Sequence, residues 1–214
     1  AGERKIRYAA IMNDRGRAAG RCGMGAVMGA KNLKAVVAAG TGMPPTADPA
    51  AVRALAREAM STIRGNLTST ALREYGTLFY MDMAMALGDA PAKYYTQSVF
   101  PAEKISGQAL RQRYLVNQYA CQGCPIGCGR EIVNFSDTLD RVDGPEYETV
   151  AGCGSNLGIF DALAVVEMNF YCDAYGLDTI STSAAIAFAM EAFENGLISL
   201  EDTGGIELRF GDPD

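Results

Sequence analysis

The pattern of hydrophobic and polar positions changes along the chain, and the change falls close to residue 43. Before it, residues 4–13 and 33–39 have apolar centres that predict short strands, separated by a glycine-rich loop that runs into a short helix. After it, apolar residues recur at helical spacing. The sequence therefore predicts an α+β fold that is predominantly helical, with one domain in residues 1–42 and a helical domain in residues 43–214.

Local signals place several of the helix ends. Asp48 followed by Pro49 is typical of an N-cap and a first helical position, and the proline-containing segment 40–48 before it reads as a linker. Gly176 is placed to end one helix and Asp178 to cap the next. We predict helices over residues 48–64, 67–75, 77–87, 106–115, 161–175 and 178–194, another that begins within 143–148, and strands over 130–135 and 205–210.

Composition and charge exclude some classes of protein. Of 214 residues, 49% are hydrophobic and 21% charged, which predicts a globular chain with a sizeable core. The formal net charge of −6 argues against nucleic acid as a partner. No apolar run is long enough for a transmembrane helix, and no secretory leader is present, so we expect a cytoplasmic protein with reduced thiols. The chain runs directly into one strand-like segment at its start and ends just after another, so we expect a piece of a longer chain.

Three cysteines are the strongest chemical signal. Cys121, Cys124 and Cys128 have the spacing C-x2-C-x3-C, with glycine and proline between them. Clustered thiols make sense when thiolates must converge on one soft metal centre, and this spacing favours an iron–sulfur cluster. A zinc knuckle or a redox dithiol is the alternative, although the chain has no histidine and no second C-x2-C pair. The fourth ligand is missing from the motif; Cys153 and Cys172 are the internal candidates.

The glycine- and arginine-rich loop has two interpretations. Gly23, Gly25 and Gly29 resemble a dinucleotide-binding fingerprint, but the first glycine does not directly follow a strand and no carboxylate ends the next one. Arg17, Arg21 and the backbone N–H groups of a helix start could instead hold phosphates. An ordinary turn with surface arginines explains the loop equally well.

Two acidic stretches also leave alternatives open. Asp178 has a structural explanation as an N-cap, whereas Asp173 in the last turn of a helix opposes the helix dipole. Together they could accept hydrogen bonds from the N–H edge of a heterocycle. Glu146, in the stretch 144–149, is either part of ordinary helix-start chemistry or a carboxylate placed to act as an acid or base.

Taken together, these stretches resemble the tungsten- and molybdenum-dependent aldehyde ferredoxin oxidoreductase family. The similar segments occur in the family's order and cover essentially the whole chain. They are residues 17–21, 25–34, 121–128, 144–149 and 173–181.

The resemblance implies a tungsten or molybdenum ion held by two molybdopterins, with a [4Fe–4S] cluster nearby. Residues 1–42 would then end a cofactor-binding β domain, and residues 43–214 would carry the cluster loop and a pterin-binding motif. By this resemblance, the pterin phosphates would be bound by Arg17, Ala18, Gly20 and Arg21, and the pterin by Asp173, Leu177 and Asp178. The cluster would be held by Cys121, Cys124 and Cys128. Glu146 would be a carboxylate near the metal. The resemblance also implies that the Ala18 carbonyl binds a magnesium ion that bridges the pterin phosphates.

Other implications concern partners. Glu167 stands where some members place an iron ligand at a dimer interface, but that iron also needs a histidine, which this chain lacks. The fourth cluster cysteine would come from beyond residue 214. Cys22 stands where many members have glycine. The implied reaction is oxidation of an aldehyde, with Glu146 taking a proton and electrons passing through the cluster to ferredoxin.

Rival functions remain. A related reductase on the same scaffold could act on carboxylic acids or on aromatic acyl-CoA, because the residues that line the substrate pocket lie largely outside this chain. A plain iron–sulfur electron carrier would need the cysteines but neither the arginines nor Asp173 and Asp178. A zinc-stabilised helical interaction module is the third alternative.

Overall fold

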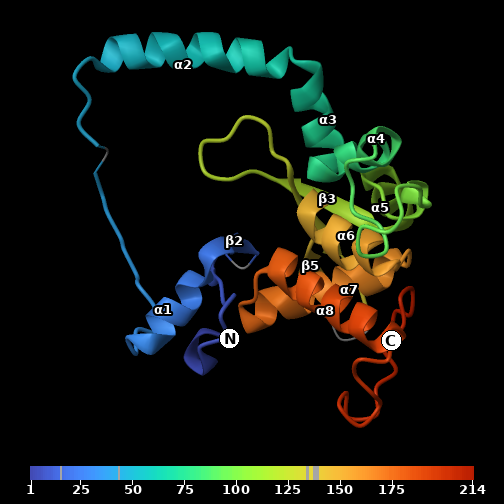
Figure 1. Cartoon of the computed structure of the whole chain (residues 1–214). Coiled ribbons are helices and arrows are strands. Elements are labelled where there is room, and N and C mark those ends of the chain that lie inside the picture. The colour runs from blue at the N-terminus through green and yellow to red at the C-terminus, as the bar shows by residue number, and fades with distance from the viewer. Residues whose placement is uncertain (15, 43, 134, 137–139) are drawn as a thin grey trace.

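The computed structural model describes residues 1–14, 16–42, 44–133, 135–136 and 140–214 (Figure 1). Helices dominate it, and two small antiparallel sheets complete it, which confirms the predicted α+β class. The α-helices are α1 (Met24–Ala30), α2 (Pro49–Arg64), α3 (Leu67–Tyr75), α4 (Met81–Leu87), α5 (Gly107–Arg113), α6 (Tyr147–Cys153), α7 (Ala162–Tyr175) and α8 (Thr179–Glu194). The strands are β1 (Ile11–Asn13), β2 (Arg17–Ala19), β3 (Leu115–Tyr119), β4 (Gly129–Val133) and β5 (Arg141–Asp143).

The hydrophobic core lies where α6, α7 and α8 meet α4 and the three-stranded sheet. Val165, Val166 and Ala187 are at most 1% exposed there. Helices α6 and α8 approach closely at Gly152, where an added Cβ would lie 2.2 Å from the Ser183 hydroxyl oxygen. A larger residue at this position would push the two helices apart. This packing fixes the start of α6 and the turn between α7 and α8, which both reach the site described below.

The two sheets carry the loops of interest. Strands β1 and β2 form a hairpin that pairs Asn13 with Arg17. Strands β3, β4 and β5 form an antiparallel meander in the order β3-β4-β5, and Tyr119 pairs with Gly129 across the first two. The three-cysteine segment is therefore the connection between β3 and β4, and its two ends are tied together by strand pairing.

The N-terminal hairpin is attached to the helical part by backbone contacts at the α7–α8 turn. The Ala10 N–H donates to the Gly176 carbonyl at 2.8 Å, and the Asp178 N–H donates to the Tyr8 carbonyl at 3.1 Å. Gly176 has φ = 69°, the left-handed conformation expected of a residue that ends a helix, and it confirms the predicted stop. These contacts bring the arginine-bearing loop after β1 to the start of α8.

Several helix predictions are confirmed. Asp48 caps α2, its carboxylate accepting the N–H groups of Ala50 and Ala51 at 3.0 and 2.9 Å, and Pro49 takes the first helical position. Asp178 caps α8 in the same way. The helix predicted over 77–87 is divided into a 3-10 helix, Gly76–Tyr80, and α4. Helix α2 lies away from the rest of the chain and has no buried residue (Figure 1).

The strand predictions were less accurate. Only Ile11–Asn13 of the stretch 4–13 forms a strand, and within the described residues neither 33–39 nor 205–210 does. Val36 and Val37 are 75% and 92% exposed, so the apolar run 33–39 has no partner to pack against here. Strands β2, β3 and β5 were missed, because each is short and depends on its neighbour for pairing. Strand β4 confirms the predicted strand up to residue 133; residue 134 lies outside the described residues. None of the helices in the described part of the chain is long and apolar enough to cross a bilayer.

Candidate functional site

A hollow of about 360 Å³ lies between the N-terminal hairpin, the start of α6 and the α7–α8 turn. Every residue that the sequence assigned to the organic cofactor or to catalysis lines it. These residues, far apart in the chain, are Arg17, Ala18, Gly20, Arg21, Glu146, Asp173, Leu177 and Asp178. The structure thus brings three separate sequence motifs to one place.

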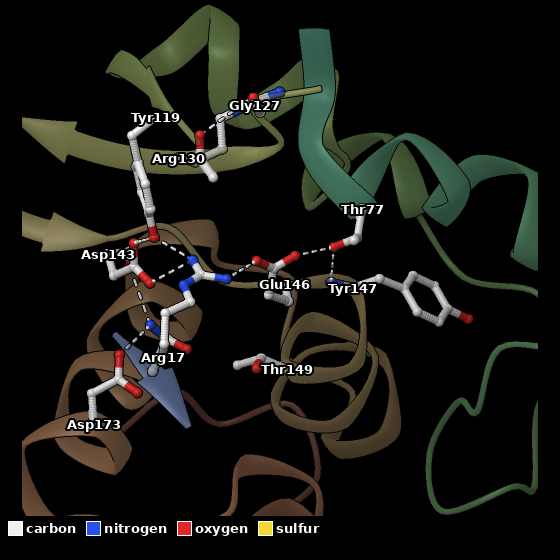
Figure 2. Close-up of polar contacts among 12 residues, drawn as sticks. Arg17, Thr77, Tyr119, Gly127, Arg130, Asp143, Glu146, Tyr147, Thr149 and Asp173 are labelled. Atoms are coloured by element: carbon white, nitrogen blue, oxygen red, sulfur yellow. Dashed lines mark hydrogen bonds and ion pairs between the residues drawn. The ribbon is translucent and has the colours of Figure 1, made fainter. Parts of the chain in front are cut away.

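Arg17, at the start of β2, is the centre of the polar contacts (Figure 2). Its guanidinium donates to the Glu146 carboxylate at 3.0 Å, to the Asp143 carboxylate at 3.1 Å and to the Tyr119 hydroxyl. The Tyr119 hydroxyl in turn donates to Asp143 at 2.5 Å. Burial opposes the charged form of Arg17, but the bonds to Glu146 and Tyr119 and the charge of Asp143 outweigh it and raise the pKa. One strand residue therefore joins β3, β5 and the start of α6.

One N–H donor of Arg17 is not used in these contacts. Its Nε atom is buried and has no hydrogen-bond partner among the residues that the structure describes. A buried N–H without an acceptor is costly, and such an atom points to a ligand or a water that completes the site. The side chain lines the hollow, so this donor fits an anionic or carbonyl oxygen of a bound cofactor.

Glu146 is held from two sides. One oxygen accepts from Arg17, and the other accepts from the Thr77 hydroxyl at 2.6 Å. That hydroxyl also accepts the Tyr147 N–H at 2.8 Å, so the direction of its own proton is fixed toward Glu146. The Glu146 side chain is 35% exposed. Because Glu146 precedes α6 without capping it through its side chain, the carboxylate remains directed into the site.

Arg21 connects two predicted cofactor motifs. Its Nη1 donates to the Asp178 carboxylate at 2.8 Å and to the Ser181 hydroxyl at 3.1 Å. Both bonds use one nitrogen and the side chain is 60% exposed, which leaves other donors for an anion. Gly20 lies beside the pair, and an added Cβ there would lie 3.6 Å from the Asp178 carboxylate.

Asp173 and Asp178, predicted as equivalent pterin contacts, differ in their surroundings. Asp178 is buried and already accepts from Arg21, the Ser181 hydroxyl and two backbone N–H groups. Asp173 accepts through one oxygen, from Asn169 at 3.3 Å. Burial, with the charge of Asp143, raises the pKa of Asp173 to about 7. Asp173 therefore has the freer oxygen for an N–H group, and near neutral pH it can also act as a donor.

The cysteine loop lies beside this network without lining the hollow. Gly123 and Gly127 have φ of 75° and 69°, which curls the loop as expected. Hydrogen bonds from the Ile126 and Gly127 N–H groups lower the pKa of the Cys124 thiol, which favours the thiolate that a metal needs. Burial, with the charge of Glu146, raises the pKa of Cys128.

The cysteine loop has the donor atoms that a metal centre needs, but the structure does not hold them in the arrangement of a metal site. All three thiols are free. Within the described residues, no group of three or more His, Cys, Asp or Glu side chains is arranged to hold a metal ion. Three free thiols in one curled loop, one of them next to backbone N–H donors, still match the chemistry of an iron–sulfur ligand loop.

Tyr119 connects the loop to the hollow. It lies two residues before Cys121, and its ring packs on Gly129, the residue after Cys128, where an added Cβ would lie 2.6 Å from the ring. The same ring has the Arg17 guanidinium 5.3 Å from its centroid. Sequence reasoning missed Tyr119, Asp143 and Thr77. The nearness of Tyr119 to the cysteines and of Asp143 to the stretch 144–149 was the available signal.

The remaining predicted residues lie elsewhere. Glu167 is exposed on α7, where its carboxylate accepts from the Tyr171 hydroxyl at 3.4 Å. Cys22 is exposed, and its φ of 73° is a conformation that favours glycine. Cys153 and Cys172 are buried in the core, and burial raises the pKa of both, that of Cys153 to about 12. Neither has the surroundings of an accessible metal ligand.

A mostly helical fold with a guanidinium- and carboxylate-lined hollow beside a three-thiol loop is suited to a cofactor-dependent redox enzyme. The family models agree. The family described as "Aldehyde ferredoxin oxidoreductase, domains 2 & 3" matches residues 54–214, and the N-terminal domain of the same family matches residues 1–40. The chain belongs to the aldehyde ferredoxin oxidoreductase family, which is a family of enzymes.

Individual relatives support the assignment. The tungsten-containing aldehyde ferredoxin oxidoreductases of Pyrococcus furiosus and Pyrococcus horikoshii are 44% and 43% identical to it and cover 95% and 99% of this chain. The WOR-like subunit of an aliphatic sulfonate oxidoreductase from Pyrococcus furiosus is 35% identical over 99% of the chain. The matches cover 34%, 35% and 34% of these three relatives, so the chain spans about a third of their length.

One solved structure shares the fold. It is the active-site complex BamBC of benzoyl coenzyme A reductase in complex with 1,5-dienoyl-CoA, with a TM-score of 0.77. It covers 98% of this chain, which corresponds to 34% of that chain, at 24% sequence identity. This likeness shows a common architecture and leaves the substrate open.

Proposed function

We propose that this chain is part of an oxidoreductase that converts aldehydes to carboxylic acids at a tungsten or molybdenum centre held by two molybdopterins. Electrons leave through a [4Fe–4S] cluster to ferredoxin. The observation that carries the proposal is the hollow, which gathers all eight predicted cofactor and catalytic residues and is joined through Arg17 and Tyr119 to the cysteine loop. The names of the tungsten-containing relatives support the choice of cofactor.

The cofactor contacts follow from the donors and acceptors that remain available. Arg21 and the unpartnered Nε of Arg17 would hold pterin phosphates, since guanidinium groups suit phosphate oxygens. The freer oxygen of Asp173 would accept a pterin N–H group. The backbone around Ala18, Gly20 and Leu177 would shape the hollow, and the Ala18 carbonyl would bind the magnesium ion. Cys121, Cys124 and Cys128 would hold the cluster, together with a fourth cysteine from elsewhere in the protein.

The bound metal would supply two-electron redox chemistry and the cluster one-electron transfer. Within the chain, Glu146 would take the proton that leaves the substrate. Thr77 and Arg17 fix both of its oxygens, so the carboxylate does not rotate away from the hollow. The exposed position of Arg21 would keep the phosphate end of the site near solvent, with the partly buried Asp143–Tyr119 pair behind it.

The plain electron-carrier alternative is less well supported. Such a protein needs the cysteine loop, but it has no use for a hollow lined by two arginines and several carboxylates. Aldehyde oxidation is favoured over a related reductase because the aldehyde oxidoreductases are 44% identical to this chain, whereas the benzoyl coenzyme A reductase structure is 24% identical. Ferredoxin, a cytoplasmic location, a homo-oligomer and an iron site at Glu167 are carried over from the family as parts of this proposal.

The test uses the full-length protein, purified without oxygen. We expect about four irons and one tungsten or molybdenum per protein, a reduced-cluster EPR signal, and aldehyde-dependent reduction of ferredoxin. Iron without tungsten or molybdenum, in a host that supplies both, would support the electron carrier. One zinc per chain without iron would support the zinc-stabilised module and contradict the oxidoreductase.

A further inference from the structure

Arg130, the second residue of β4, bridges the cysteine loop and the end of α3 (Figure 2 shows its contact with Gly127). One guanidinium nitrogen donates to the Gly127 and Gly129 carbonyls at 3.3 and 2.9 Å. The other donates to the Leu72 carbonyl at 2.9 Å and to the Arg73 carbonyl. The side chain thus binds the backbone on both sides of Cys128 and the last turn of a helix at once.

Arg130 has no carboxylate at ion-pair distance among the described residues, and the Glu146 charge acts on it only from farther away. In the part of the chain that the structure describes, Arg17 and Arg21 of the hollow and the neighbouring Arg111 form ion pairs, whereas Arg130 forms none. Its four acceptors are all backbone carbonyls. A cation at the C-terminal end of a helix is stabilised by the helix dipole, which explains how α3 tolerates it without a counter-charge.

A glycine makes room for the Arg130 side chain between α3 and the cysteine loop. Gly76 follows α3 with φ = 65°, and an added Cβ there would lie 3.2 Å from the Cys128 carbonyl oxygen and 3.5 Å from Arg130 Cγ. The end of α3, the end of the loop and the Arg130 side chain are therefore packed against each other at a glycine. None of the eight residues predicted for the organic cofactor and for catalysis takes part in this contact.

We propose that Arg130 is a positioning residue for the cysteine loop: it fixes the segment around Cys128 against α3 and places a positive charge without an ion-pair partner beside the proposed metal centre. The second part rests on the proposed function, because it concerns the cluster that Cys121, Cys124 and Cys128 would hold. One-electron reduction of a cluster adds one negative charge, which a nearby fixed cation stabilises. Arg130 then raises the reduction potential of the cluster.

The first measurement is amide hydrogen exchange in the full-length protein. In R130Q and in R130K we expect exchange at residues 127–129 to become at least tenfold faster, because neither side chain can bridge four carbonyls. The matched control is R111Q. Arg111 also donates to a carbonyl at the end of α3, that of Glu74, but it is paired with the Glu74 carboxylate and does not touch the loop. Unchanged exchange in both Arg130 variants would overturn the positioning role.

The second measurement is the cluster midpoint potential, followed by EPR during a redox titration. We expect R130Q to shift it to more negative values, R111Q to shift it less, and R130K, which keeps the charge, to remain closer to the wild type. Equal shifts in R130Q and R111Q would overturn the electrostatic role. Should the wild-type protein bind no iron, the proposed function fails, while the exchange measurement still decides whether Arg130 anchors the loop.

Discussion

Around Arg17, carboxylate and phenol groups from β3, β5 and the start of α6 already lie at hydrogen-bond distance, whereas the three thiols between β3 and β4 lie close in sequence without forming a ligand group. The first region is assembled by contacts within this chain. The second has a curled backbone and suitable donors, but its side chains are free. Both regions share Tyr119, which hydrogen-bonds to the first and flanks the second.

The difference has a physical origin. Charged groups that are half-buried need partners, so folding alone drives Arg17, Asp143 and Glu146 together. Neutral thiols gain little from one another, and three of them converge only when a metal takes up their charge. We therefore expect the Arg17 network to survive loss of the metal and the loop geometry to depend on it.

The most severe test of this contrast is C124S, which removes a loop thiol. We expect complete loss of the cluster EPR signal and of ferredoxin-linked activity, because a serine hydroxyl is a poor iron ligand. The thermal midpoint of the metal-free protein should change little, since the Arg17 network does not involve Cys124. C22S, at an exposed thiol outside the cysteine loop, is the control and should keep its iron. A metal-free C124S protein that unfolds at a much lower temperature would show that the two regions are not independent.

The next test addresses the Arg17 region through E146Q. A glutamine keeps the shape and one acceptor oxygen but cannot take up a proton. We expect kcat to fall by about 100- to 10,000-fold, the usual contribution of a general base, with metal content retained. E103Q, at an exposed glutamate of the 3-10 helix Ala102–Lys104, is the control for the charge change. Wild-type kcat in E146Q would exclude Glu146 as the base.

A smaller effect is expected for T77V, which removes the hydroxyl between Glu146 and the Tyr147 N–H. Losing one charge-assisted hydrogen bond and leaving an N–H unpaired costs about 1–3 kcal/mol. We expect kcat/KM to fall by about tenfold, because the Glu146 carboxylate loses a donor that holds it in place. T77S retains the hydroxyl and should behave like the wild type. If T77S and T77V are equally impaired, the methyl packing matters and the hydroxyl does not.

The sequence predicted the helices and their caps better than the strands. Asp48, Gly176 and Asp178 act through local chemistry that a short window contains. Strands β2, β3 and β5 are three to five residues long, and each exists because another segment pairs with it. The run 33–39 shows the converse error, because its apolar residues have no sheet to join within the described residues.

From the sequence, only those site residues that belong to a motif could be predicted. The resemblance marked Arg17, Glu146 and Asp173, and the structure places them around one hollow. Thr77, Tyr119 and Asp143 follow no motif, since their importance comes from reaching those residues across the fold. The roles themselves stay predictions, and the contacts now make them specific enough to test.

The smallest expected effect is a pH-dependent loss of stability caused by Asp173. Burial and Asp143 raise its pKa to about 7, against about 3.9 in an unfolded chain, although Arg17 opposes this. Between these values the folded protein keeps a proton that the unfolded protein loses, so stability falls as the pH rises from about 4 to about 7. For the metal-free protein in urea we expect D173N to weaken this dependence by the order of 1 kcal/mol, discounted because the carboxyl is partly exposed. D140N, at an exposed aspartate, should retain the full dependence. A D173N curve parallel to the wild type would mean that Asp173 titrates as it does in water, and that the Arg17 region tolerates its charge without cost.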